Sequence, residues 1–133
     1  KKTIEKQPEL MFDKILDRFR SGADIKGSDY VAAWQRLEIL RRTYQNATQG
    51  YDAILCPTSP IVPPNAARLL TDEDYYVTEN LLALRNTRVG NLLDLCAVTL
   101  PTGVPSCGLM MLAGPYQEKR LLRLAMAAER ALN

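Results

Sequence analysis

The chain has 133 residues, of which 47% are apolar and 24% are charged. This composition excludes a disordered or collagen-like chain, and a net charge of only +2 is not typical of a nucleic-acid-binding protein. The sequence contains no histidine, which excludes Ser-His-Asp and Cys-His catalytic arrangements and every histidine-ligated metal site.

The cysteines and the longest apolar run indicate the compartment. Cys56, Cys96 and Cys107 are odd in number and widely spaced, without a Cys-x-x-Cys pair, which favours a reducing environment over a disulfide framework. The run from Leu92 to Pro101 contains Asp94 and is far shorter than a membrane span. We therefore expect a cytoplasmic protein that binds neither membrane nor nucleic acid.

Residues 1–50 are predicted to be helical. A first helix is expected to begin at Pro8 and to end at Gly22, because its apolar residues recur with helical spacing. A second helix is expected to follow, with Ser28 as its N-cap and Gly50 at its end. The apolar positions of the first helix are Leu10, Met11, Ile15, Leu16 and Phe19.

The middle of the chain combines a short strand, a stiff loop and helices. The apolar run Ala53–Cys56 is too short for a helix and is stopped by Pro57, so it predicts a buried strand. Four prolines between Pro57 and Pro64 predict an extended loop. The sequence Thr71–Asp74 has the spacing of a helix-capping box and predicts the start of a helical stretch.

The last third predicts two strands and a terminal helix. Ala97–Leu100 and Leu109–Leu112 are strand candidates, and the segment Pro101–Gly108 between them is rich in turn-forming residues. An amphipathic helix follows Gly114 and Pro115. Helices that alternate with short apolar strands indicate α/β architecture, although three strands are few for a sheet that is buried on both faces.

The residues that could carry chemistry all have simpler structural interpretations. Cysteines in or beside apolar strands behave as small hydrophobic residues. The acidic run Asp72–Asp74 suits a helix N-terminus as well as it suits a metal. None of the four serines lies in a glycine-rich turn that would expose a nucleophile. The residues alone therefore predict no complete active site.

Several segments, taken in order, resemble the amidase signature family of hydrolases. Individually each motif is weak, but their order and spacing together are specific. The pattern Tyr-Asp-apolar-Pro-Thr-x-Pro is followed by an Asn-containing segment, a Gly-rich strand and a closing Glu-x-x-Leu helix, and the helix before them is also similar. The segments are Gly27–Tyr30 with Ala33 and Arg36, Tyr51–Pro60, Asn91–Gly103, Gly108–Pro115 and Tyr116–Leu122.

The resemblance implies a fold and also where the catalytic residues of the enzyme lie. Residues 1–133 are expected to form the C-terminal portion of an amidase domain, a mixed sheet flanked by helices, with 1–50 as a helical lead-in and 51–133 as the strand-containing part. Family members cleave amides with a Ser–cis-Ser–Lys triad in a glycine- and serine-rich signature, which this chain lacks. The chain alone is therefore predicted to be inactive, and no metal or organic cofactor is implied.

The resemblance also implies substrate-binding positions, although no catalytic ones. Leu84, Arg88 and Asn91 correspond to residues that line the pocket in some relatives. A guanidinium at position 88 would favour amides with a polar or anionic far end. Structural roles stay open for all three residues: packing for Leu84, a solvated position for Arg88 and a backbone hydrogen bond for Asn91.

The resemblance leaves the branch of the family open. Asp94 and Cys96 stand where glycine and proline are usual, a pattern similar to the allophanate-hydrolase-like branch. An amidotransferase A-type subunit with a tRNA-binding partner and a non-catalytic interaction module are the alternatives. Besides a small amide substrate, the expected partner is the N-terminal remainder of the enzyme or a second copy of the chain, since uncovered strands would expose apolar surface.

Overall fold

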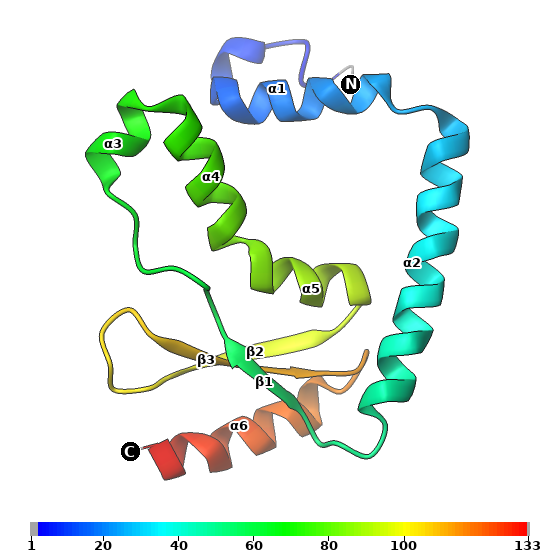
Figure 1. Ribbon diagram of the computed structural model, residues 1–133, viewed down its shortest axis with the longest axis vertical. Coiled ribbons are helices and arrows are strands. Elements are labelled where there is room, and N and C mark those ends of the chain that lie inside the picture. The colour runs from blue at the N-terminus through cyan, green and yellow to red at the C-terminus, as the bar shows by residue number, and fades with distance from the viewer. Residues whose placement is uncertain (1–2, 133) are drawn as a thin grey trace. The chain divides into compact units, whose positions relative to one another are not determined.

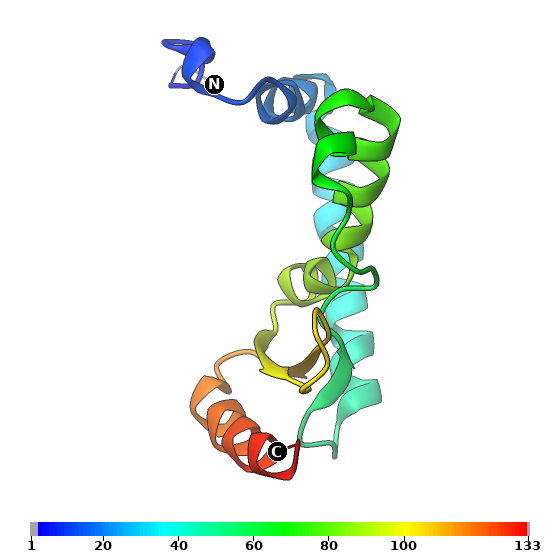
Figure 2. The same ribbon diagram turned by 90° about the vertical axis from the view of Figure 1, so that its left-hand side faces the viewer.

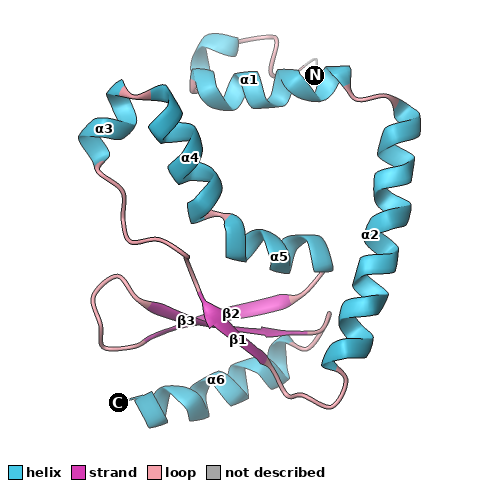
Figure 3. Ribbon diagram, viewed as in Figure 1, coloured by secondary structure: helices cyan, strands magenta, loops and turns pink. Residues whose placement is uncertain are grey.

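A computed structural model describes residues 3–132, and its helices and strands are drawn in Figures 1 and 3. The chain divides into two compact units between Glu38 and Ile39. The elements are η1 (Pro8–Leu10), α1 (Asp13–Ser21), η2 (Gly22–Asp24), α2 (Gly27–Thr48), β1 (Ile54–Pro57), α3 (Ala66–Thr71), α4 (Glu73–Ala83), α5 (Arg85–Leu93), β2 (Cys96–Pro101), β3 (Gly108–Ala113) and α6 (Glu118–Leu132).

The first unit is helical, as predicted, but its first helix is shorter than expected. Pro8 opens the separate 3-10 turn η1, and the backbone of Phe12 is non-helical, with ψ 124°. The α-helix therefore begins only at Asp13, and the prediction of one helix from Pro8 was wrong. Its predicted end at Gly22 is confirmed. Leu16 is the buried apolar side chain that this helix contributes.

The long helix α2 begins one residue earlier than its predicted cap. Ser28 already lies inside the first turn, so the prediction that it caps the helix was wrong, and its hydroxyl lies 3.4 Å from a carboxylate oxygen of Asp29. The helix ends at Thr48. Gly50 follows with a φ of 94°, a left-handed conformation that costs glycine little, and this confirms the predicted stop.

The second unit contains a three-stranded sheet in the order β1-β3-β2. Both strand pairs are antiparallel, with Leu55 opposite Met111 on one side of β3 and Val98 opposite Met111 on the other. All three predicted strands are confirmed within one or two residues at each end, and so is the α/β architecture. The central strand β3 is the most deeply buried of the three.

Helices cover both faces of this sheet, α6 on one and α5 on the other (Figures 1 and 2). On the α6 side, Leu121 and Ala125 pack against a cluster that includes Leu100 and Met111. On the opposite side, Gly90 of α5 brings its backbone close to Leu112: a Cβ at Gly90 would lie 3.4 Å from the side chain of Leu112.

The two covering layers are offset across the sheet. Leu55 of β1 shares the α6 face with Met111, yet it is 57% exposed, whereas Met111 is 6% exposed. On the other face Thr99 of β2 is exposed although its partner on β3, Met110, is 2% exposed. Each edge strand therefore leaves one face uncovered, and the uncovered faces lie on opposite sides.

The connection from β1 to β2 contains three helices. The helix α3 was not predicted; Asn65 caps it by accepting a hydrogen bond from the N–H of Arg68 at 3.0 Å. The next cap is Asp72, which accepts from the N–H of Tyr75 at 2.9 Å, so the predicted capping by Thr71 was shifted by one residue.

Candidate functional site

A groove opens where the proline-rich loop after β1 meets the loop between β2 and β3. Its volume is about 530 Å³, within the range of about 300–1,000 Å³ that is usual for small-molecule sites. Antiparallel pairing of β1 with β3 brings the two loops together, although they are far apart in the sequence. This loop groove is lined by Leu55, Cys56, Pro57, Ser59, Pro60, Ile61, Val62, Thr102, Ser106, Cys107, Gly108 and Leu109.

Three hydrogen bonds fix the start of the proline-rich loop, which forms one wall of the loop groove. The N–H of Thr58 donates to the carbonyl of Gly108 at 2.9 Å, which continues the β1–β3 pairing beyond the strand end. Nδ2 of Asn86 on α5 donates to the carbonyl of Pro57 at 2.8 Å. The hydroxyl of Thr58 donates to that of Thr99 on β2 at 3.2 Å. Strands β2 and β3 and helix α5 therefore all contribute to holding this wall.

The threonine pair depends on a glycine at position 108. A Cβ built there would lie 2.8 Å from Oγ1 of Thr58 and 2.9 Å from Cγ2 of Thr99, closer than such atoms approach in real structures. Because glycine has no side chain, this position of the central strand β3 leaves the space in which the side chains of Thr58 and Thr99 meet. A larger residue would have to move at least one of the threonines.

The lining combines apolar walls with a few hydroxyl groups. Thr102 uses its hydroxyl to donate to the carbonyl of Cys107 at 3.0 Å. The hydroxyl oxygen of Ser59 accepts from the N–H of Ile61 at 3.4 Å. Among residues 3–132, neither Ser59 nor Ser106 donates its hydroxyl proton to another group. These two protons are available to a ligand acceptor in the loop groove.

The lining carries no charged side chain. The one lysine of the second unit, Lys119, lies at the start of α6 and does not line the loop groove. A serine hydroxyl is a weak nucleophile unless a neighbouring base takes its proton. The described lining therefore supplies apolar contacts and hydrogen bonds, but no general base.

The predicted substrate-binding residues lie elsewhere, with Leu84 as the N-cap of α5 and Arg88 and Asn91 within this helix. Leu84, Arg88 and Asn91 are spaced four and three residues apart, which places them on one face of the helix. All three are exposed, Leu84 by 43%. The opposite face carries Asn86 and Gly90, which contact the loop start and the sheet. None of the three predicted residues lines the loop groove.

The backbone hydrogen bond that remained open for Asn91 is not formed by its side chain. In the part of the chain that the structure describes, neither Asn91 nor Arg88 makes a side-chain hydrogen bond or ion pair. A different side chain bonds a backbone carbonyl at the end of α5: Nε of Arg41 on α2 donates a hydrogen bond to the carbonyl of Leu92 at 2.9 Å. The polar groups of Arg88 and Asn91 on the outward face of α5 are therefore not engaged by other described side chains.

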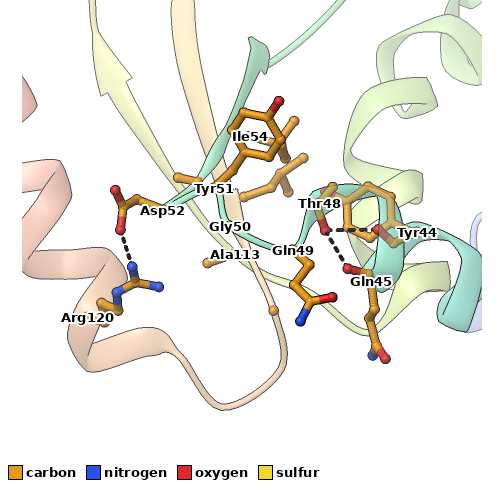
Figure 4. A pocket seen from close by; sticks show the side chains of 13 residues that line it. Tyr44, Gln45, Thr48, Gln49, Gly50, Tyr51, Asp52, Ile54, Ala113 and Arg120 are labelled. Carbon is orange, nitrogen blue, oxygen red and sulfur yellow. Dashed lines mark hydrogen bonds and ion pairs between the residues drawn. The ribbon is translucent and has the colours of Figure 1, made fainter.

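A smaller cavity, of about 200 Å³, lies between the end of α2, the start of β1 and the end of β3 (Figure 4). Asp52 of the Tyr-Asp motif forms an ion pair there with Arg120 of α6. The motif aspartate thus ties the entry of β1 to the terminal helix. Burial raises the pKa of Tyr44, and the nearby Cys56 thiol contributes to the rise. The Asp52–Arg120 ion pair at this cavity therefore has a structural role, because it connects the segment before β1 to α6.

The acidic run at Asp72–Asp74 has a structural explanation. Asp72 is the N-cap of α4 and also forms an ion pair with Arg68 at 2.9 Å. Within residues 3–132, no group of three or more potential metal-ligating side chains is assembled. In the same range, no helix is both long and apolar enough to cross a membrane.

The polar lining of the loop groove was not predicted from the sequence. Ser59 and Ser106 were interpreted only as possible nucleophiles, a role that the absence of a glycine-rich turn argues against. The available signal is their position, because each lies in a turn-rich segment next to a strand end. Only the pairing of β1 with β3 shows that these two segments meet.

Comparison with known proteins identifies the family. A model of the family described as Amidase matches residues 3–122. The chain is 32% identical to 2-amino-5-chloromuconic acid deaminase of Comamonas testosteroni over 122 residues, 86% of this chain and 26% of that protein. It is 37% identical to a fatty acid amide hydrolase of Oryza sativa subsp. indica over 109 residues, 77% of this chain and 18% of the relative.

A third relative is the A-type subunit of the glutamyl-tRNA(Gln) amidotransferase of Prochlorococcus marinus, 32% identical over 123 residues, 90% of this chain and 24% of the relative. No solved structure matches the chain. The chain spans about a quarter or less of the length of these relatives. Since the family match covers most of the residues, the resemblance noted in the sequence is confirmed: the chain belongs to the amidase signature family.

Proposed function

We propose that this chain is part of an enzyme that hydrolyses carbon–nitrogen amide bonds, and that it forms sheet and substrate-pocket wall in that enzyme. The family match over residues 3–122 is the observation that carries the proposal. Relatives named fatty acid amide hydrolase and amidase support it. The reacting groups, a nucleophilic serine with its lysine base, would come from sequence outside these 133 residues.

The loop groove has the properties that a pocket wall needs. Its apolar side chains can pack against the substituents of an amide, and the hydroxyls of Ser59 and Ser106 can donate to its carbonyl oxygen. Holding the carbonyl in a fixed position lowers the entropic cost of attack by a nucleophile. The hydrogen bonds at Pro57 and Thr58 keep one wall in place for that purpose.

The test has two parts. The purified chain is expected to release no ammonia from simple aliphatic or aromatic amides, whereas a longer protein that contains it should do so. The coding sequence upstream of Lys1 is read for a Gly- and Ser-rich signature. Turnover by the 133-residue chain itself, with contaminating host amidase excluded, would overturn the assignment of the reacting groups to other sequence. An upstream sequence without the signature would favour a non-catalytic interaction module.

The outward face of α5 is proposed as a second part of the pocket wall, formed by Leu84, Arg88 and Asn91. The exposed guanidinium of Arg88 could form two parallel hydrogen bonds with a carboxylate at the far end of a substrate. Hydrogen bonds to charged groups contribute about 1.5–3 kcal/mol. Arg88→Ala in the longer enzyme should therefore lower kcat/KM for amides with an anionic end and leave neutral ones nearly unchanged.

A matched pair of substrates decides this role. Two amides of the same length, one ending in a carboxylate and one in a methyl ester, serve as substrates. Their kcat/KM values are compared between the longer enzyme and its Arg88→Ala variant. Equal losses for the two substrates would show that Arg88 has a structural role. Arg85→Ala, at the first position of the same helix, is the control for removing a positive charge from α5.

The second candidate function is that of an amidotransferase A-type subunit, which would act with a tRNA-binding partner. The observation in its favour is the similarity to relatives named as this subunit of glutamyl-tRNA(Gln) amidotransferase. Affinity purification of the longer protein from its native source should recover a second, tRNA-binding subunit in equal amount if this is the function. Ammonia release from amides without such a partner favours the first proposal.

The edge strands support a further part of the proposal, the contact with more protein. The α6-side face of β1 and the opposite face of β2 are each left exposed, at Leu55 and Thr99 respectively. A sheet with uncovered apolar surface tends to pair or associate. We expect the isolated chain to self-associate or to bind the remainder of its enzyme, as measured by sedimentation velocity at micromolar concentration. A monodisperse monomer with a cooperative melt above about 60 °C would contradict this.

A further inference from the structure

We propose that the smaller cavity, beside the Asp52–Arg120 ion pair, binds a small zwitterion: an α-amino acid with a short side chain. This cavity and the loop groove lie at opposite ends of the β1–β3 pair, because Ile54 pairs with Leu112 at the cavity and Pro57 pairs with Leu109 at the groove. The proposal does not rest on the proposed function. It adds a second binding site to the second unit.

The first argument is that the cavity carries one charge of each sign, and that neither is fully used. A guanidinium has five N–H donors, and Arg120 donates to Asp52 through Nη2. Asp52 accepts this bond through Oδ1, and in the part of the chain that the structure describes its Oδ2 accepts none. The carboxylate of a zwitterion can accept from Arg120 while its ammonium group donates to Asp52. A ligand with only one of these charges is attracted by one member of the pair and repelled by the other.

The second argument is the presence of two glutamine side chains beside this ion pair. Gln45 and Gln49 extend from the end of α2 to the side of the cavity on which Arg120 lies (Figure 4). Among residues 3–132, no hydrogen bond engages the amide group of either side chain. An amide donates through its nitrogen and accepts through its oxygen. These two groups can therefore complete the hydrogen bonds of a carboxylate or of an ammonium group.

The third argument is the size of the cavity and its apolar lining. Its volume of about 200 Å³ is below the range of about 300–1,000 Å³ that is usual for drug-sized ligands. Leu112 and Ala113, which are 3% and 9% exposed, form part of the lining. They exclude water on that side, which strengthens the attraction between opposite charges. The cavity therefore suits a charged molecule of the size of alanine and is too small for an amino acid with a large side chain.

The test is a titration of the whole nitrogen-15-labelled chain with alanine, followed by NMR. The backbone amide signals of Gly50 and Gly114, which line the cavity, should shift until they saturate. Propanoate lacks the ammonium group of alanine, and ethylammonium lacks its carboxylate. At the same ionic strength, each should therefore bind at least about tenfold more weakly than alanine. Phenylalanine, which is too large for the cavity, should cause no saturable shift.

Variants around the ion pair locate the site. Arg120→Gln and Asp52→Asn should each weaken alanine binding by about tenfold or more. Arg123→Gln removes a positive charge from an exposed position of α6 outside the cavity, and it should bind alanine as the natural chain does. Gln49→Met leaves the ion pair intact and should weaken binding about two- to tenfold. This variant decides the question where circular dichroism shows that the ion-pair variants are unfolded.

Three results would overturn the proposal. They are the absence of a saturable shift with alanine, equal affinity for propanoate or ethylammonium, and unchanged affinity in the folded variants of Asp52, Arg120 and Gln49. The readout is binding to the chain without substrate turnover. A longer enzyme that hydrolyses amides while its cavity binds no amino acid would therefore keep the proposed function and discard this site.

Discussion

The helices α1 and α6 have similar amphipathic patterns but very different surroundings. On α6, Leu121 and Ala125 are 2% and 3% exposed, because they pack on the sheet. On α1, Leu16 is buried at 6% exposure, but Phe19 is 60% exposed. Apolar spacing thus predicts that a helix forms and which side is apolar. It does not predict how much of that side another element will cover.

The difference follows from what each helix can contact within its own unit. The second unit supplies a sheet, whose regular surface accepts a row of side chains from one helix. The first unit supplies short helical segments, which offer a smaller apolar surface. Exposed residues such as Leu10 and Ile25, 76% and 61% exposed, belong to this unit. Pairs of positions that are alike in chemistry but differ in their contacts can therefore separate the effect of packing from that of composition.

The largest effect is expected from Leu121→Ala. It removes the most deeply buried side chain of α6 and leaves a cavity against the sheet, which costs about 2–5 kcal/mol of unfolding free energy. Leu122→Ala, next to it but 60% exposed, should change stability by less than about 0.5 kcal/mol. Urea denaturation followed by circular dichroism measures both. Similar losses at the two positions would show that the α6–sheet interface does not hold the unit together.

The strands were the most predictable elements, for a physical reason. Each is a short apolar run bounded by proline or glycine, so its length and ends are set locally. The missed elements depended on weaker local signals. The extended backbone at Phe12 has no sequence signature, and α3 lies directly after a proline-rich segment that predicted a loop.

The candidate site was less predictable than the fold. Leu84, Arg88 and Asn91 came only from the family resemblance, and the structure places Arg88 and Asn91 in α5 and Leu84 at its N-cap, outside the loop groove. The loop groove could not be derived, because it exists only through the strand order β1-β3-β2 and the register that aligns Pro57 with Leu109. Strand order is a long-range property that periodicity does not encode.

The next effect in size is expected at Gly108. Gly108→Ala places a methyl group against Thr58 and Thr99, and such overpacking typically costs about 1–3 kcal/mol. Gly114→Ala is the matched control, since a Cβ at position 114 meets nothing within 4 Å. Thermal melts of the two variants test this. A Gly108→Ala variant as stable as Gly114→Ala would mean that the threonine pair moves freely and does not fix the groove wall.

A smaller loss is expected from Asn86→Ala. The change removes the hydrogen bond from α5 to the carbonyl of Pro57, and one neutral hydrogen bond contributes about 0.5–1.5 kcal/mol. Because this bond holds the start of the proline-rich loop, amide hydrogen exchange at Ser59 and Ile61 should also accelerate. Thr87→Ala, on the same helix, has its hydroxyl bonded within α5 to the carbonyl of Leu84 and serves as control. Equal exchange rates in the two variants would exclude the anchoring role of Asn86.

The smallest effect concerns acid and the helix cap at Asp72. The N–H of Tyr75 and then the Arg68 guanidinium lower the pKa of this carboxyl group in the folded state. The unfolded chain has a pKa near 3.9 for aspartate. Folding therefore favours the ionised form of Asp72. The stability that results is fully present above the pKa of the unfolded chain, and it is lost as the pH falls through the pKa of the folded state.

Asp72→Asn separates the charge from the cap, because asparagine caps helices about as well as aspartate but does not titrate in this range. The melting temperature of the natural chain should exceed that of Asp72→Asn at pH 6, and the difference should shrink as the pH falls below about 3.9. Asp74→Asn, two residues further on in the same first turn, controls for loss of one negative charge. A difference between the natural chain and Asp72→Asn that does not change with pH would show that the ionised carboxylate adds nothing to the cap.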